Sequence, residues 1–155
     1  MERVVVKVGG NVLLDPAQVK ILVGEVGSLV AAGCVVTPVG WDAQGPLNTN
    51  ADEAAAAVAA TLRASWLILA TDVAAVRDGE GNAVLRLDSA GARRLIASSA
   101  ATGGMIPKLH AAVAALRQGV GRVLITKVQP GSLSAAVLRG DSQGTLVEND
   151  LEVVG

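Results

Sequence analysis

The chain has 155 residues, is 51% hydrophobic and 1% aromatic, and carries a formal net charge of −1. Its length suffices for one domain whose core must be built from Val, Leu, Ile and Ala, which favours buried parallel strands covered by helices. The near-zero charge gives no bulk attraction to nucleic acid or to an anionic membrane. No apolar run has membrane-spanning length and the start is unlike a signal peptide, so we expect no membrane partner and a cytoplasmic protein.

The first strand carries a charge. Residues 4–8 form an apolar run that Lys7 interrupts, and Gly9 and Gly10 follow. A lysine inside such a run is costly to bury without a partner. Two interpretations stay open: an edge strand with Lys7 facing water, or a strand that delivers an ammonium group beside a glycine loop able to approach phosphate.

A helix and a short strand follow. Apolar residues recur at helical spacing after Asp15-Pro16, which predicts a helix that ends near residues 31–33. Residues 34–36 read as a second strand. Residues 41–47 contain glycine and proline and read as a polar loop.

The stretch from residue 48 to residue 78 organises the rest of the chain. Asn50 is a helix N-cap candidate with Glu53 at the capping-box position, and an Ala-rich run then carries a helix to about residue 63. Residues 66–70 read as a buried strand that ends at Thr71-Asp72. A polar pair at the carboxyl end of such a strand is typical of ligand sites in α/β folds.

The remaining chain alternates helices and strands. We expect a hairpin-like excursion over residues 73–86, with turn chemistry at 78–82, and then a helix over 89–97 capped by Asp88. Further helices are predicted over 105–117 and 132–138, and strands over 122–126 and 144–147.

The chain has only four lysines, which are Lys7, Lys20, Lys108 and Lys127. Lys108 stands in the first turn of a predicted helix, where a cation opposes the helix dipole at a cost of roughly 0.3–1 kcal/mol. It is either an exposed lysine that pays this cost or a second positive group aimed at an anion. With Lys7, and with Asp52 to orient both, it would form a clamp suited to phosphoryl transfer.

Other chemistry has weaker support. Cys34 is the only cysteine and His110 the only histidine, so the sequence predicts no disulfide and no cysteine or histidine metal site. Asp72 and Asp78 could hold Mg²⁺, but Asp78 is more simply a turn residue. A GxGxxG dinucleotide signature is absent.

Several motifs, in this order, resemble the amino acid kinase family and within it the acetylglutamate kinases: K-V-G-G at 7–10, P-V-G at 38–40, N-T-N-A-D at 48–52, L-I-L-A-T-D-V at 67–73, T-G-G-M-I-P-K at 102–108, G-V-G-R-V at 119–123 and G-T at 144–145. The resemblance implies an αβα sandwich with a mainly parallel central sheet. We expect a single domain over 1–155, in which a first βα unit with the glycine loop (1–33) joins a nucleotide-binding half (34–155).

The resemblance also implies an activity, the ATP- and Mg²⁺-dependent phosphorylation of the side-chain carboxylate of N-acetyl-L-glutamate, in arginine biosynthesis, or of a related small carboxylate. Lys7 and Lys108 would stabilise the transferring phosphoryl group and Asp52 would orient both. Gly9 and Gly10 would contact phosphate or the acyl acceptor, and Asn48 would contact the acceptor. The ATP site would be lined by Asp72, Val73, Ala74, Ala75, Val76, Arg77, Ala100, Ala101 and Thr102.

The chain departs from the family pattern after the first helix. It passes from Ala32-Gly33 straight into residues 34–40, without the second glycine-rich loop (H-G-G-G) and the arginine that grips the acceptor, and Ala75 replaces a family glycine. Three hypotheses stay open: a kinase, a nucleotide-binding remnant or minimal engineered form without turnover, and a subunit that completes its site with another chain. A reduced parallel sheet should leave an edge or face unshielded, so we expect a homo-oligomer.

Overall fold

The computed structural model of the chain describes residues 3–8, 16–30, 35–36, 41–42, 45–46, 50–98, 103–140 and 143–149. Its centre is a six-stranded sheet in the order β2-β1-β5-β9-β10-β8. All neighbouring strands are parallel except β9 and β10. The strands are β1 (Val4–Val8), β2 (Val35–Val36), β5 (Trp66–Thr71), β8 (Arg86–Asp88), β9 (Arg122–Lys127) and β10 (Thr145–Glu148).

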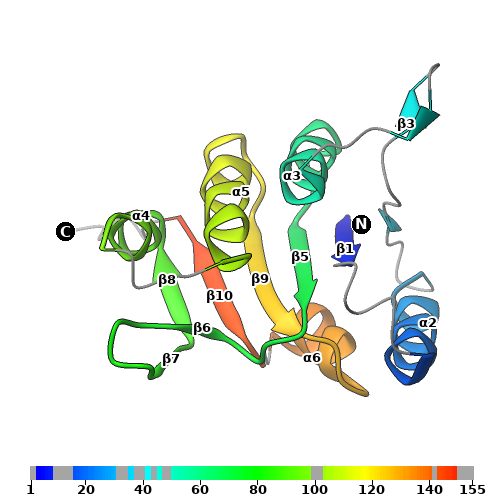
Figure 1. Cartoon of the computed structure of the whole chain (residues 1–155). Helices are drawn as coiled ribbons and strands as arrows, with labels where there is room; N and C mark the ends of the chain where they lie inside the picture. Colours follow the sequence, from blue (N-terminus) through cyan, green and yellow to red (C-terminus); the bar gives the residue numbers. More distant parts are fainter. Residues whose placement is uncertain are drawn as a thin grey trace.

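Helices cover both faces of this sheet (Figure 1). On one face lie α3 (Ala51–Thr61), α4 (Ser89–Ala97) and α5 (Met105–Arg117), and on the other lie α2 (Pro16–Val30) and α6 (Ser132–Arg139). The predicted αβα sandwich with a mainly parallel sheet is therefore confirmed. No helix in the described ranges is long and apolar enough to cross a membrane.

The β5 strand is the central member of the parallel part, because it pairs with β1 on one side and β9 on the other. All six of its residues are buried, as its continuous apolar run predicts for a strand covered on both faces. Alternate residues of β5 point to opposite faces of the sheet and pack into two separate hydrophobic cores. Leu67 and Leu69 belong to the core under α3 and α5, whereas Trp66 and Ile68 belong to the core with α6.

The start of α3 follows the predicted capping pattern with one difference. The Asn50 side chain accepts a hydrogen bond from the backbone N–H of Asp52 at 3.1 Å, so the helix begins where the sequence indicates. Glu53, however, accepts from the side-chain amide of Asn50 at 3.0 Å, whereas a capping box would use the Asn50 backbone N–H. The first turn is thus closed by two side chains that contact each other.

Two small antiparallel ribbons lie outside the main sheet. The predicted excursion contains the ribbon of β6 (Val76–Arg77) and β7 (Ala83–Val84). The segment predicted as a loop contains β3 (Trp41–Asp42) and β4 (Gly45–Pro46). The sequence analysis missed β8, which has only three residues and gains its backbone partners from β10 far along the chain.

A buried carboxylate joins the two helices on the α6 face. Glu25 of α2 is 7% exposed and accepts hydrogen bonds from the backbone N–H groups of Gly131 at 2.6 Å, Leu133 at 2.9 Å and Ser134 at 3.3 Å. The N-cap position of α6 is Gly131, which has no side chain to cap with. Glu25 therefore supplies from another helix the acceptor that the first turn of α6 needs.

We expect Glu25→Ala to lower the free energy of unfolding by about 2 kcal/mol, because it leaves N–H groups at the start of α6 without their acceptor. Urea denaturation measures this change. Lys20→Ala, an exposed substitution on the same helix, is the control and should shift stability by less than about 0.5 kcal/mol. Equal effects of the two substitutions would contradict the capping role of Glu25.

Candidate functional site

Three charged side chains from three separate elements meet above the sheet. The Lys7 Nζ atom lies 2.7 Å from Asp52 Oδ1, and the Lys108 Nζ atom lies 3.3 Å from Asp52 Oδ2. The exposed fractions of the three side chains are 11% for each lysine and 6% for the aspartate. The structure thus brings together the three residues that the sequence analysis singled out as a clamp.

Lys7 reaches this position because of the strand that carries it. Val5, two residues earlier, belongs to the core under α3 and α5, so strand alternation places Lys7 on the same face. The β1 strand pairs with β2 on one side and β5 on the other, which excludes the interpretation of Lys7 as a water-facing residue of an edge strand. Lys7 is 9% exposed and is balanced by Asp52.

The other two residues stand in the first turns of their helices. Asp52 lies at the start of α3, where the helix dipole favours a negative charge. Lys108 lies at the start of α5, where the same effect opposes a positive charge, and its Nζ atom also lies 3.5 Å from the carbonyl oxygen of Gly104. Packing of α3 against α5 then brings carboxylate and ammonium together.

The charges of this cluster do not balance. Among the described residues, two ammonium groups share one carboxylate, so the Lys7–Asp52–Lys108 cluster carries one excess positive charge on side chains that are only 11% exposed. Burial of an uncompensated charge is costly. An anion with several oxygens, such as a phosphoryl group, would supply the missing counter-charge and accept hydrogen bonds from both lysines.

The predicted nucleotide loop lies next to this cluster along the sheet. Asp72 follows β5 directly and accepts a hydrogen bond from the Thr71 hydroxyl at 3.1 Å. Asp72, Val73 and Ala74 are exposed and Ala75 is half-buried. The loop therefore begins at the carboxyl end of the strand next to β1, the position where α/β sheets bind ligands.

Two residues of this loop are engaged in other ways. The side chain of Val76 is fully buried in the core, and its backbone N–H donates to the Thr145 hydroxyl at 2.8 Å. The Arg77 guanidinium donates to the carbonyl oxygen of Gly81 at 2.6 Å, within the hairpin turn. The side chain of Val76 is therefore not accessible to a ligand. The side chain of Arg77 is held in place by its hydrogen bond to the turn.

The hairpin turn is held together by Asp78. Its Oδ1 atom accepts from the backbone N–H groups of Asn82 at 2.8 Å and Glu80 at 3.0 Å, and these bonds, that of Asn82 first, lower the pKa of the Asp78 carboxyl below its ordinary value. This geometry agrees with the interpretation of Asp78 as a turn residue.

Six of the predicted site residues lie outside the described residues: Gly9, Gly10, Asn48, Ala100, Ala101 and Thr102. Their roles remain predictions from the family resemblance.

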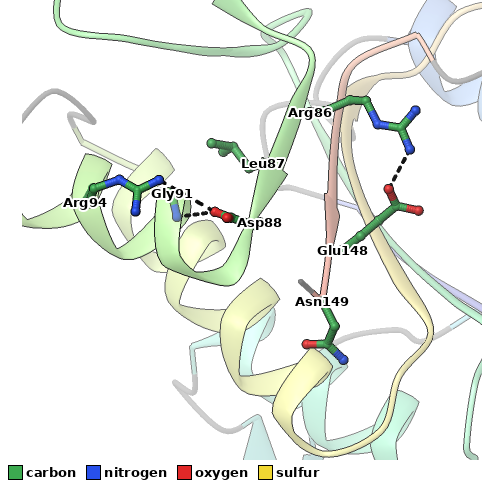
Figure 2. A pocket seen from close by; sticks show the side chains of 7 residues that line it. All are labelled: Arg86, Leu87, Asp88, Gly91, Arg94, Glu148 and Asn149. Carbon is green, nitrogen blue, oxygen red and sulfur yellow. Dashed lines mark hydrogen bonds and ion pairs between the residues drawn. The ribbon is translucent and has the colours of Figure 1, made fainter. Parts of the chain in front are cut away.

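A cavity of about 620 Å³ lies at the far edge of the sheet between β8, β10 and α4 (Figure 2). It contains two arginines, and each has a carboxylate partner. Arg86 lies 2.7 Å from Glu148, and Arg94 lies 3.9 Å from Asp88, which also caps α4 through the N–H of Gly91. Because these charges are paired, the cavity lacks the unbalanced positive charge of the Lys7–Asp52–Lys108 cluster.

The sequence analysis assigned no role to one further lysine. Lys127 ends β9 and pairs in register with Thr71, at the same sheet edge as the nucleotide loop. The available signal was a lysine at the end of a buried apolar run, which resembles the lysine near the end of the first strand.

The fold is a mainly parallel αβα sandwich in which two lysines and one aspartate meet near the carboxyl ends of the strands. The chain belongs to the amino acid kinase family, whose family model matches residues 30–127.

Curated relatives in this family are acetylglutamate kinases. The protein from Rubrobacter xylanophilus is 44% identical over 117 residues, which is 75% of this chain and 45% of that protein. The protein from Caulobacter sp. is 38% identical over 115 residues, which is 73% of this chain and 38% of that protein. The chain thus spans less than half the length of these relatives.

Solved structures show the same fold. N-acetylglutamate synthase from Neisseria gonorrhoeae, in complex with coenzyme A and L-arginine, is 29% identical with a TM-score of 0.65, over 77% of this chain and 29% of that chain. Carbamate kinase from Giardia lamblia bound to AMP-PNP is 23% identical with a TM-score of 0.56, over 76% of this chain and 44% of that chain, which supports the fold alone.

The charge imbalance leads to a prediction for stability without ligand. Lys108→Met removes the excess positive charge and the opposition to the α5 dipole, which offsets the lost ion pair, so we expect the free energy of unfolding to stay within about 1 kcal/mol of wild type or to rise. Asp52→Asn leaves two neighbouring ammonium groups without a counter-charge and should cost about 3 kcal/mol. Chemical denaturation compares the two variants. A larger loss for Lys108→Met than for Asp52→Asn would contradict this charge balance.

Proposed function

We propose that the chain binds ATP at the carboxyl edge of its sheet and acts as the phosphoryl-transferring part of a kinase whose acceptor is a carboxylate, N-acetylglutamate or a related small molecule. The observation that carries the proposal is the Lys7–Asp52–Lys108 cluster, in which two buried ammonium groups share one carboxylate.

Each residue of the cluster has a distinct part in this proposal. The transferring phosphoryl group lies between the Lys7 and Lys108 ammonium groups, which stabilise its negative charge. Asp52 holds both ammonium groups in place before ATP arrives, so little reorganisation is needed during transfer. This arrangement suits phosphoryl transfer, in which positioning and charge stabilisation supply most of the catalysis.

Mg²⁺ fits this site as a partner of the nucleotide. Among the described residues there is no group of three or more histidine, cysteine, aspartate or glutamate side chains that could hold a metal ion. Mg²⁺ is commonly held by one or two carboxylates together with substrate phosphates, and Asp72 is the exposed carboxylate at this edge. When bound, the ion would neutralise charge on the phosphates.

The acceptor assignment rests on similarity to acetylglutamate kinases. A second candidate function is nucleotide binding without turnover. It is favoured by the short connection after Ala32-Gly33, which lacks the glycine-rich loop and the acceptor-binding arginine of the family pattern. A dicarboxylate needs such a cation to select it. A second copy of the chain could supply the missing wall.

Calorimetry with Mg-ATP, followed by an ADP-release assay with and without N-acetylglutamate, tests the proposal. Acceptor-dependent ADP release that Asp52→Asn abolishes supports the kinase. ATP binding without release supports the second candidate, and no ATP binding overturns both. Light scattering at the assay concentration establishes whether an active species is a monomer or an oligomer.

We expect Lys108→Ala to weaken ATP binding by about tenfold and adenosine binding by less than twofold, because the ammonium group acts on phosphate charge. Titration calorimetry measures both ligands. Lys20→Ala removes an exposed lysine from α2 and should leave both affinities unchanged. Equal weakening of ATP and adenosine by Lys108→Ala would assign that lysine a structural role.

We also expect Mg-ATP to slow hydrogen exchange over residues 72–77, the loop at the carboxyl end of β5. Exchange measured by mass spectrometry, with and without nucleotide, follows peptides from this loop and from residues 132–140. Protection confined to residues 132–140 would show that the nucleotide binds elsewhere.

A further inference from the structure

Lys127, like Lys7, lies near the carboxyl end of a parallel strand of the sheet. It is the last residue of β9, and β1, β5 and β9 are parallel neighbours whose carboxyl ends meet at one edge of the sheet. Val123 and Ile125 belong to the core under α3 and α5, so strand alternation places Lys127 on the face that carries Lys7. Two strand spacings, roughly 10 Å, separate the strands of the two lysines.

Lys127 has no carboxylate partner among the residues that the structure describes. Its side chain is half-buried, and within the described ranges it forms no ion pair. The carboxylate of the cluster, Asp52, is already shared by Lys7 and Lys108. Among the described residues, this edge therefore carries a third ammonium group without a carboxylate partner, and a ligand could supply the counter-charge.

A cavity of about 350 Å³ links Lys127 to the predicted nucleotide loop. Its described walls include Ala74 and Ala75 of that loop together with Leu85, Gln129 and Gln143, and Lys127 is the one charged residue among them. Apolar walls with a few polar groups and one cation are typical of sites for small charged molecules.

The backbone around Lys127 is held in place. The Thr126 hydroxyl donates to the carbonyl oxygen of Gln143, and the carbonyl oxygen of Lys127 lies within hydrogen-bond distance of the same hydroxyl. Gly144 has a φ of +137°, and a Cβ atom there would lie 2.5 Å from the carbonyl oxygen of Ile125, so only glycine permits this close approach. Residues 143–144 thus pack against the end of β9 and fix the point from which Lys127 extends.

We propose that Lys127 is a third phosphate-binding cation of this site and that it binds a nucleotide phosphate on the side of the 72–77 loop, away from the transferring group held by Lys7 and Lys108. This inference rests on the proposed function. A nucleoside triphosphate carries its charges along a chain, so cations spaced along one edge can bind different phosphates. Lys127 then contributes to binding of ADP as well as ATP, whereas Lys108 acts chiefly on the phosphate that ADP lacks.

The test compares Lys127→Met, Lys127→Arg, Lys108→Met and the control Lys20→Met by calorimetry with Mg-ATP, Mg-ADP, adenosine and inorganic pyrophosphate. We expect Lys127→Met to weaken ATP and ADP alike by about tenfold and adenosine by less than twofold, and Lys127→Arg to keep affinity within about threefold. Lys108→Met should weaken ATP more than ADP, and Lys20→Met should change nothing.

The outcomes separate this inference from the proposed function. Wild-type affinity of Lys127→Met for ADP and ATP, or equal weakening of adenosine, overturns the role of Lys127 and leaves the proposed function standing. If the wild-type chain binds no nucleotide, the proposed function fails. Pyrophosphate binding then decides whether Lys127 belongs to a phosphate-binding site. Pyrophosphate binding that Lys127→Met removes and Lys127→Arg keeps supports the phosphate site; absent or unchanged pyrophosphate binding overturns it.

Discussion

The carboxylate of Asp52 is the interaction on which the candidate site depends. It joins Lys7 on β1 to Lys108 on α5, two residues that are remote in the sequence and meet only because α3 presents Asp52 between them. Without this carboxylate, two ammonium groups would be buried side by side with no counter-charge. With it, the cluster is one negative charge short, which an anion can supply. The same group therefore holds the elements together and, in the proposed function, leaves the excess positive charge for a phosphate to balance.

The sheet provides the frame in which these charges act. Because β1, β5 and β9 run parallel and adjacent, Lys7, Asp72 and Lys127 all lie at or near one edge. The antiparallel strand β10 begins at that edge. The Thr145 hydroxyl accepts from the N–H of Val76 and donates to the carbonyl oxygen of Val84, which fastens the hairpin beside the nucleotide loop to the main sheet.

The opposite face contributes rigidity. Glu25 caps α6 from α2, so the first βα unit, which includes Lys7, is tied to the segment that follows Lys127. The matched residues cover less than half the length of the acetylglutamate kinase relatives, and the turnover assay tests what completes the acceptor side in this chain.

Local patterns in the sequence determined much of this protein. The apolar runs specified β1, β5 and β9, the caps Asn50 and Asp88 specified the starts of α3 and α4, and the family motifs identified Lys7, Asp52 and Lys108 as a group. These signals are local because helix and strand periods and caps involve residues a few positions apart.

Tertiary structure alone decided the rest. Only the sheet order showed that β1 is internal and Lys7 buried, and only pairing with β10 made residues 86–88 a strand. The cap that Glu25 places on α6 spans 106 residues and the Lys108–Asp52 contact spans 56, so both depend on how helices pack rather than on neighbouring residues. Lys127 became a candidate phosphate-binding residue because the strand register places it beside Thr71. Register between distant strands cannot be read from neighbouring residues in the sequence.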